Sequence, residues 1–183
     1  NGKSYDTSMG FTPVDGLIMG TRCGSTDPGA LIYIAEKEGL NLNRLSVLIN
    51  KESGMLGVTG VSSDMRDIRA AAQSGNERAQ LAIEMFAARI KKFIGSYAAL
   101  MGGLDMIVFT GGIGENDALT RRLVSENLEF MGVRFNAELN ENVHGENTLL
   151  SLPDSRVKVA VVATNEELVI ASDTFRLTSP SVK

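Results

Sequence analysis

A short apolar run that ends in a cluster of glycines constrains the fold of this chain more than any other feature. Residues 106–110 read MIVFT, and Gly111, Gly112 and Gly114 follow before a helical pattern runs over residues 117–131. A continuous apolar run of this length is typical of a strand that is buried on both faces. The segment therefore predicts a strand, a tight turn and a helix in succession.

The same arrangement returns near the end of the chain. Residues 157–164, VKVAVVAT, form a second strand-like run, and Thr164 and Glu167 have the spacing of a capping box at the start of a helix. Two such units indicate an α/β fold. Because ligands of open α/β sheets bind beyond the carboxyl ends of the strands, the loops 110–116 and 163–166 are expected to converge.

The rest of the chain is predicted to be mainly helical. Residues 7–29 are rich in glycine, threonine and proline, yet they are too apolar for a solvated linker and are expected to form an ordered loop. The predicted helices are 30–37 and 43–51, closed by Gly39 and Gly54; one with Ser63 as its N-cap and Gly75 beyond its end; and a long helix over 77–101. In this last helix, large apolar residues from Leu81 to Leu100 recur at three- and four-residue spacing and predict a core-facing stripe.

Composition and charge exclude several classes of partner. The 183 residues are 43% hydrophobic, which suits one compact domain. The formal net charge is −4, so we expect no binding to nucleic acid or to an anionic membrane surface. The sequence lacks an apolar run long enough to cross a bilayer and does not open with a leader pattern, which predicts a cytoplasmic location.

Cysteine and histidine are too scarce for several kinds of site. Cys23 is the single cysteine and His144 the single histidine, which excludes an internal disulfide and a histidine–cysteine zinc site within this sequence. His144 lies in the polar stretch NENVHGENT, which is more typical of a solvated loop than of a catalytic base.

The glycine cluster has two interpretations. Glycines where a strand becomes a helix can let backbone N–H groups and the positive helix end face an anion such as a nucleotide phosphate. A tight turn with close helix–strand packing explains them equally well. The segment matches neither the dinucleotide fingerprint, whose third glycine would fall at Asp117, nor the lysine-containing Walker A pattern.

Four charged residues are candidates for a site. Arg22 lies among glycines in IMGTRCGSTDPG and could reach a phosphoryl group, or it could form a surface salt bridge. Asp64 and Arg66 lie at the start of a predicted helix. The positive end of the helix dipole there favours the negative charge of Asp64 and does not favour the positive charge of Arg66. Glu166 has no part in the capping box and could hold Mg²⁺ through water, or it could simply be solvated.

Four motifs together resemble the carboxyl-terminal half of the acetate kinase family. They are DTSMGFTPVDGLIMGTR, GVSSDMRDIR, VFTGGIGEN and ATNEELVIA, in the family's order and spacing over essentially the whole chain. The resemblance implies a ribonuclease-H-like (actin-like ATPase) fold, with a mixed sheet flanked by helices. It also implies phosphoryl transfer between ATP and acetate, giving ADP and acetyl phosphate, with Mg²⁺. Residues 1–183 would then be a single carboxyl-terminal nucleotide-binding domain.

The resemblance also implies roles for individual residues. Arg22 matches the arginine that stabilises the phosphoryl group in flight, Pro13 a proline that lines the acetate methyl pocket, and Glu166 the glutamate associated with Mg²⁺. The positions that match nucleotide-contacting segments are Asp64, Met65, Arg66, Gly112, Ile113, Gly114, Glu115 and Asn116.

The same resemblance implies that part of the catalytic apparatus is missing. The family's amino-terminal asparagine, second arginine, catalytic aspartate and histidine, and phosphate loop have no counterpart in this sequence, so the chain alone is expected to be inactive. A homodimer formed through this half is implied as well. Propionate kinase is the first alternative, and a non-catalytic domain for nucleotide binding or dimerisation is the second. Butyrate kinase is disfavoured by the stretch DTSMGFTP.

Overall fold

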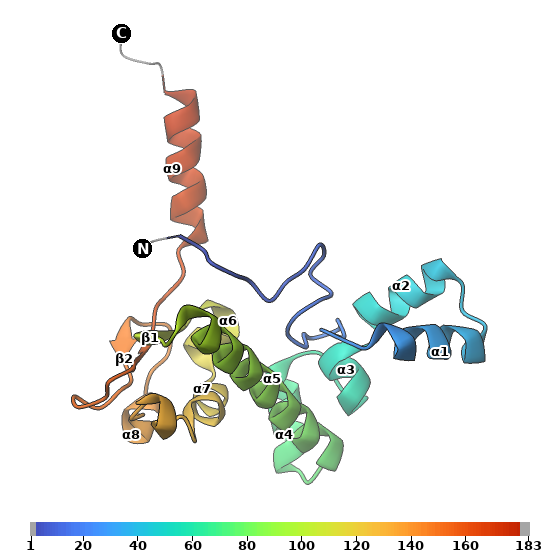
Figure 1. Cartoon of the computed structure of the whole chain (residues 1–183), viewed down its shortest axis with the longest axis horizontal. Coiled ribbons are helices and arrows are strands. Elements are labelled where there is room, and N and C mark those ends of the chain that lie inside the picture. Colours follow the sequence, from blue (N-terminus) through green and yellow to red (C-terminus); the bar gives the residue numbers. More distant parts are fainter. Residues whose placement is uncertain (1–2, 180–183) are drawn as a thin grey trace. The chain divides into compact units, whose positions relative to one another are not determined.

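The computed structural model describes residues 3–179, and the chain divides into two compact units, Asn1–Leu104 and Asp105–Lys183. The first unit is helical and the second contains a mixed sheet with helices (Figure 1). The α/β class expected from the sequence is therefore confirmed. That the whole chain acts as one nucleotide-binding domain stays a prediction.

The first unit begins with an irregular segment and continues as a series of helices. These are α1 (Pro28–Glu38), α2 (Leu42–Lys51), α3 (Gly54–Thr59), α4 (Met65–Gln73) and α5 (Glu77–Met101). The predicted helices are confirmed, and the long one has the predicted bounds. Helix α3 is not among the predicted helices, because Gly54 starts this helix instead of closing α2. Gly54 has φ +65°, and a β-carbon there would collide with the carbonyl oxygen of Met19.

Helix α5 packs through small residues, which corrects the predicted core face. Its buried residues are Ala79, Ala82, Ile83, Phe86, Ala87 and Ala98. Of the predicted stripe, Phe86 is buried, whereas Leu81, Met85 and Leu100 are exposed. Alanines allow the backbones of neighbouring helices to approach closely, and α5 contacts α3 and α4, the latter lying beside it in Figure 1. Close approach to these two short helices therefore selected the alanine face over the face with the larger side chains.

The second unit is built on a sheet that, among the described residues, has three strands in the order β1-β3-β2. Strands β1 (Met106–Phe109) and β3 (Lys158–Val161) are parallel, with Phe109 opposite Val161, and β2 (Thr148–Leu149) is antiparallel to β3. The helical segments are α6 (Gly111–Asn116), α7 (Ala118–Ser125), the 3-10 turn η1 (Glu129–Met131), α8 (Ala137–Asn140) and α9 (Glu166–Thr178). The parallel pair places the carboxyl ends of β1 and β3 at the same edge of the sheet.

Two expectations for this unit are wrong in detail. Strand β1 alternates instead of being buried on both faces: Ile107 and Phe109 are buried, but Met106 and Val108 are 47% and 48% exposed. The reason is its position at the edge of the described sheet, whereas β3 lies between two strands and is buried from Val159 to Val161. The helix expected over 117–131 stops at Ser125 and is followed by η1.

A buried arginine joins several segments of the second unit. Arg121, on α7, is 0% exposed. Its Nε donates to Asn140 Oδ1 at 2.8 Å, and its Nη1 donates to the carbonyl oxygens of Gly114 and Glu115 at 3.0 and 2.8 Å. Its Nη2 donates to the carbonyl oxygens of Asn140 and Val143 at 3.0 and 2.8 Å. One guanidinium therefore holds α6, α7, α8 and the turn after α8 together.

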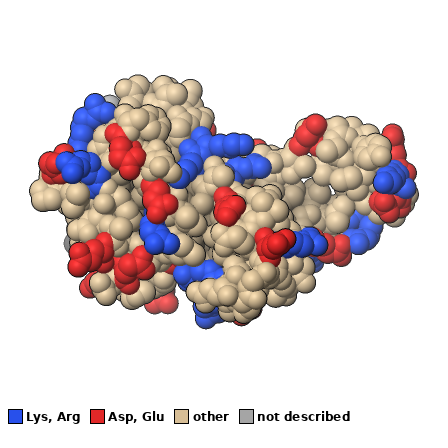
Figure 2. All heavy atoms as spheres, turned by 90° about the horizontal axis from the view of Figure 1, so that it is seen from below, with Lys and Arg blue, Asp and Glu red and all other residues tan. Residues whose placement is uncertain are grey.

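Two observations concern the predicted lack of binding to membranes and nucleic acid: the character of the described helices and the distribution of charge on the surface. Within residues 3–179, no helix combines the length and apolar character needed to cross a bilayer. On the face drawn in Figure 2, basic and acidic side chains are interspersed over both ends of the view.

We predict that Arg121→Met strongly destabilises the protein. The variant would remove the donor from five carbonyl and amide oxygens, so the free energy of unfolding should fall by about 3–5 kcal/mol. Urea unfolding of the 183-residue chain measures the change. The matched control is Arg122→Met at the neighbouring, partly exposed arginine, which should change the free energy by about 0.5 kcal/mol. Equal losses in the two variants would contradict the structural role of Arg121.

Candidate functional site

The residues singled out from the sequence fall in both compact units, and each group is described within its own unit. The first unit carries Pro13, Arg22, Asp64, Met65 and Arg66, and the second carries Gly112, Ile113, Gly114, Glu115, Asn116 and Glu166.

The backbone around Arg22 is fixed by the helices that follow it. Carbonyl oxygens of the loop accept hydrogen bonds from N–H groups at the start of α3: Met19 from Met55 at 2.8 Å, Gly20 from Leu56 at 2.9 Å and Thr21 from Ser53 at 3.1 Å. The N–H of Cys23 donates to the carbonyl oxygen of Ile49 near the end of α2. Arg22 therefore sits on a rigid loop whose shape does not depend on its own side chain.

The side chain of Arg22 has no anionic partner among the described residues. It is half-buried, and its Nη1 approaches the sulfur of Met19 at 3.8 Å. Within residues 3–179 it forms no ion pair, so the surface salt bridge considered from the sequence is not present. A planar fork of donors on a rigid loop suits recognition of a carboxylate or phosphoryl group.

The Arg22 loop lies against the turn that precedes α4. A β-carbon at Gly20 would be 3.1 Å from the carbonyl oxygen of Ser63, the residue before Asp64. The first unit thus brings the candidate residues at 22 and 64–66 into neighbouring segments. Pro13 is exposed on the irregular segment that precedes this loop.

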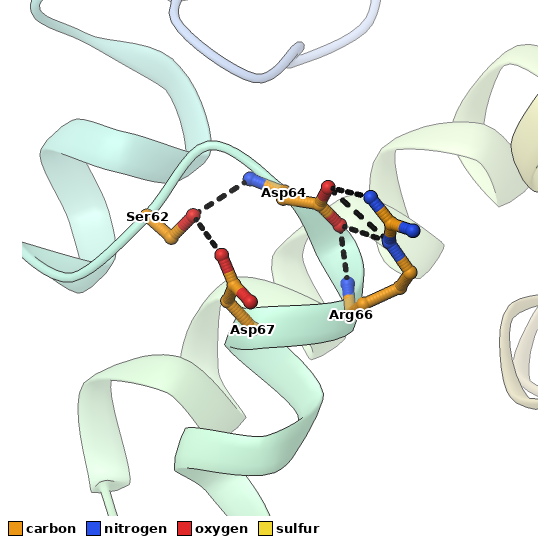
Figure 3. A network of polar contacts seen from close by, with 4 residues as sticks. All are labelled: Ser62, Asp64, Arg66 and Asp67. Atoms are coloured by element: carbon orange, nitrogen blue, oxygen red, sulfur yellow. Dashed lines mark hydrogen bonds and ion pairs between the residues drawn. The ribbon is translucent and has the colours of Figure 1, made fainter.

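Asp64 and Arg66 contact each other at the start of α4 (Figure 3). Asp64 Oδ1 accepts from the N–H of Arg66 at 2.8 Å, and Arg66 Nη2 donates to Asp64 Oδ2 at 2.6 Å. The N-cap is therefore Asp64 and not Ser63, which corrects the sequence-based expectation. Ser62 supports this turn, since its Oγ accepts from the N–H of Asp64 and donates to Asp67.

This pairing sets the charge state of both groups. The hydrogen bonds from the Arg66 side chain and backbone lower the pKa of Asp64 to about 2, and Asp64 in turn raises the pKa of Arg66. The Arg66 side chain is largely exposed. A ligand that uses this guanidinium would therefore share it with Asp64. Met65, between the two, is buried.

The three glycines after β1 have different structural reasons. Gly111 adopts φ +71°, which favours glycine. A β-carbon at Gly114 would lie 3.1 Å from the carbonyl carbon of Phe109, so this glycine permits close helix–strand packing. Gly112 has neither constraint, because its φ is not positive and a β-carbon there would meet open space. Turn and packing thus explain two glycines, and Gly112 is the position left for the approach of a ligand. The segment itself is the short helix α6 and not a loop.

The loops that follow β1 and β3 meet at Glu115. Its Oε1 accepts from the N–H of Gly111 at 2.8 Å, and from the N–H and Oγ1 of Thr164 at 2.9 and 2.7 Å. The Thr164 contacts contribute most to lowering the pKa of the Glu115 carboxyl. The predicted convergence of the two loops is therefore confirmed. The predicted capping box is wrong: the Thr164 hydroxyl serves Glu115, and Asn165 caps α9 by accepting from the N–H of Leu168.

Three other candidates of this unit lie on its surface. The Asn116 amide donates to the carbonyl oxygen of Gly112 at 3.1 Å, and Ile113 is exposed. Glu166 is the first residue of α9 and is exposed. No group of three or more histidine, cysteine or acidic side chains that could hold a metal ion occurs within residues 3–179.

Two residues shape this region in ways that the sequence motifs do not predict. Thr164 has the spacing of a cap, although its place just beyond a parallel strand is a signal that it could face the neighbouring loop. Arg121 gave no signal, because the carbonyl groups that it binds come from segments distant in the sequence. His144 is exposed, as its polar surroundings predicted.

Comparison with known proteins gives consistent results. A family model described as the Acetokinase family matches residues 1–172. The acetate kinase of Parabacteroides distasonis is 55% identical over 177 residues, which cover 97% of this chain and 44% of the relative. The crystal structure of Porphyromonas gingivalis acetate kinase aligns with a TM-score of 0.94 and 54% identity, over 97% of this chain and 44% of that one. A propionate kinase from Francisella tularensis aligns with a TM-score of 0.86 and 44% identity, over 94% and 44%. The chain thus spans less than half the length of these relatives.

We predict that Arg66 controls the titration of Asp64. In the wild type the Asp64 carboxyl should titrate near pH 2, and in Arg66→Gln it should titrate closer to its ordinary value of 3.8. Because the folded pKa is depressed, the pairing stabilises the protein above about pH 3.8 and loses this effect as the pH falls through about 2. Carbon-13 NMR of the carboxyl group measures both midpoints. Lys92→Gln, which removes a positive charge from an exposed position of α5, should leave the Asp64 midpoint unchanged.

Proposed function

Because this chain belongs to the acetokinase family, we propose that it is the carboxyl-terminal part of an acetate kinase, which transfers a phosphoryl group between ATP and acetate. The single observation that carries this proposal is the family match over residues 1–172, with 55% identity to an acetate kinase over nearly the whole chain. The products of the forward reaction are acetyl phosphate and ADP, and Mg²⁺ is the proposed metal.

Arg22 is the residue proposed to act on the transferring group. In phosphoryl transfer the protein mainly positions the reactants and stabilises charge on the phosphoryl oxygens. A guanidinium on a rigid loop, with no ion pair among the described residues, is suited to this task. The acceptor carboxylate is already ionised at neutral pH, so a strong general base is unnecessary.

Each unit carries positions that are proposed to contact the nucleotide. Asp64, Met65 and Arg66 would contribute from the first unit, and the segment from Gly112 to Asn116 from the second. Support for the second group comes from Gly112, which neither backbone strain nor packing explains. Pro13, exposed on its segment, is proposed to line the pocket for the acetate methyl group.

In this chain, Mg²⁺ would be held only in part by protein side chains, and water and substrate phosphates would supply its other ligands. Mg²⁺ is commonly held by one or two carboxylates together with water and substrate phosphates. Glu166 is an exposed carboxylate that could supply one such ligand, directly or through water, and the described residues contain no acidic cluster that would bind the ion alone. When bound, the ion would neutralise charge on the nucleotide phosphates.

The exposed helix α9 supports the proposal that the chain is inactive alone. None of its residues is buried, and its large apolar side chains are 59–79% exposed: Leu168, Val169, Ile170, Phe175 and Leu177. An isolated helix of this length is only marginally stable in water, so we infer that these side chains pack against a further part of the protein. Acetate-dependent ATP consumption by the pure 183-residue chain would contradict the proposal that the chain is inactive alone.

We also propose a cytoplasmic homodimer, as the resemblance implies. Helices α1 and α2 contain no buried residue, and Ile32, Tyr33 and Leu42 are exposed on them. This apolar surface is available to a second copy of the chain. Sedimentation that showed only monomer at high concentration would refute the dimer.

Propionate kinase is the second candidate, favoured by the likeness to the Francisella tularensis structure. The two acids differ by one methylene, which is worth about 1–3 kcal/mol in an apolar pocket. The ratio of kcat/KM for acetate and propionate in the full-length enzyme decides between them. A ratio above one in favour of acetate supports the first proposal.

We predict that Arg22→Ala in the full-length enzyme lowers kcat by about 10³-fold or more, because charge stabilisation in the transition state is lost. Arg44→Ala is the control, since Arg44 is paired with Glu52 on the exposed side of α2. Its kcat should match the wild type. An unchanged kcat in Arg22→Ala would instead favour a non-catalytic nucleotide-binding or dimerisation domain.

We also predict that Gly112→Val weakens nucleotide binding without destabilising the fold. The added side chain would meet open space in the protein but would occupy the proposed path of the ligand. Calorimetric titration with Mg-ADP should show an affinity about 10-fold lower or worse, while the melting temperature stays close to that of the wild type. Gly95→Val, at another glycine with open space around it, should retain the wild-type affinity. Unchanged affinity in Gly112→Val would leave the glycine without a role in binding.

A further inference from the structure

One oxygen of Glu115 joins two loops that are far apart in the sequence. Oε1 accepts three hydrogen bonds, one from Gly111 at 2.8 Å and two from Thr164 at 2.9 and 2.7 Å. Gly111 is the first residue of α6, and Thr164 lies two residues before α9 begins at Glu166. We call these three residues, Gly111, Glu115 and Thr164, the Glu115 clamp.

The chemistry of the clamp favours an ionised carboxylate. All three groups that face Oε1 are donors in this arrangement, and an ionised carboxylate is the side chain that only accepts. Hydrogen bonds to an ionised acceptor are also stronger than neutral ones. A glutamine at this position could still accept through its amide oxygen, but its hydrogen bonds would lack the negative charge that strengthens those of the carboxylate.

The main chain of Glu115 is anchored as firmly as its side chain. Its carbonyl oxygen accepts from Arg121 Nη1 at 2.8 Å and from the N–H of Gly145 at 3.2 Å. With both parts held, the carboxylate has little freedom to turn toward a ligand. The clamp therefore ties the positions of the two loops to the buried hydrogen bonds of Arg121.

The clamp borders two of the proposed functional positions. Gly112 directly follows Gly111 in the sequence, and Glu166 is two residues beyond Thr164. Thr164 lies in the short segment that leads from β3 to Glu166. Within residues 3–179, this segment is held by the contacts of Thr164 with Glu115 and by the hydrogen bond from the N–H of Ala163 to Asn147 Oδ1 at 2.8 Å.

We propose that Glu115 is a positioning residue that holds the backbone at Gly112 and the carboxylate of Glu166 in register with each other. It acts through Gly111 and Thr164. Within the segment from Gly112 to Asn116, the Glu115 side chain then does not itself contact the nucleotide, in place of the direct contact implied by the family resemblance. This inference rests on the proposed kinase function. It predicts that the clamp governs the affinity for the metal–nucleotide complex more than the rate of the chemical step.

The test uses the full-length enzyme and two pairs of variants. Glu115→Gln removes the charge of the clamp, and Glu126→Gln makes the same change outside the clamp, at the residue that follows α7. Thr164→Val removes the hydroxyl donor, and Thr164→Ser retains it. The KM for MgATP should rise about 10-fold in Glu115→Gln and Thr164→Val, with kcat at saturation within about threefold of the wild type. Glu126→Gln and Thr164→Ser should retain the wild-type KM.

Amide hydrogen exchange in the 183-residue chain separates this inference from the proposed function. The N–H groups of Gly111 and Thr164 should be protected in the wild type and should exchange faster in Glu115→Gln, whatever reaction the full-length protein catalyses. A wild-type enzyme without kinase activity but with protected amides would overturn the function and leave the clamp as a structural device. An active enzyme whose variants melt earlier but keep the wild-type KM for MgATP would overturn the positioning role.

Discussion

The buried guanidinium of Arg121 is the interaction on which the second unit depends. Burial lowers the pKa of this group, and nearby Asp117 and Glu141 oppose the shift, so it stays charged and must be satisfied by acceptors inside the protein. It finds them on α6, α8 and the turn that follows. Because these acceptors include the last carbonyl groups before Asn116, the same contact also fixes where the glycine segment ends.

The glycine segment is consequently held from both sides by groups of opposite charge. Arg121 binds carbonyl oxygens near the end of α6, and the Glu115 carboxylate binds the N–H of Gly111 at its start. Gly112 lies between them with open space above its α-carbon. In the first unit the loop that carries Arg22 is organised in a similar way, since neighbouring helices bind its backbone and its side chain forms no ion pair within residues 3–179. Both arrangements prepare a polar surface before any ligand arrives, which lowers the cost of ordering it on binding.

The sequence predicted local features well and the choice of faces poorly. Helix α5 has the predicted bounds because Asn76 and Gly102 mark its ends through contacts within a few residues. Its buried face was wrong, because the two helices packed on it select alanines over larger side chains. The cap of α4 moved by one residue to Asp64, since Arg66 and Ser62 both bind this aspartate and its backbone. Strand β2 escaped notice because its two residues carry no periodic signal.

The sequence by itself determined the family, the helical segments with strong end signals, and the meeting of the loops after two parallel strands. These follow from residue types and spacings that act over a few positions, or from the geometry that all parallel pairs share. Tertiary structure alone decided that Thr164 binds Glu115, which is 49 residues away, and that Arg121 is buried among backbone carbonyl groups. Such contacts depend on where distant segments lie in the folded chain. Every residue has a backbone carbonyl group, so no sequence pattern predicts which of these groups will accept a hydrogen bond from a given side chain.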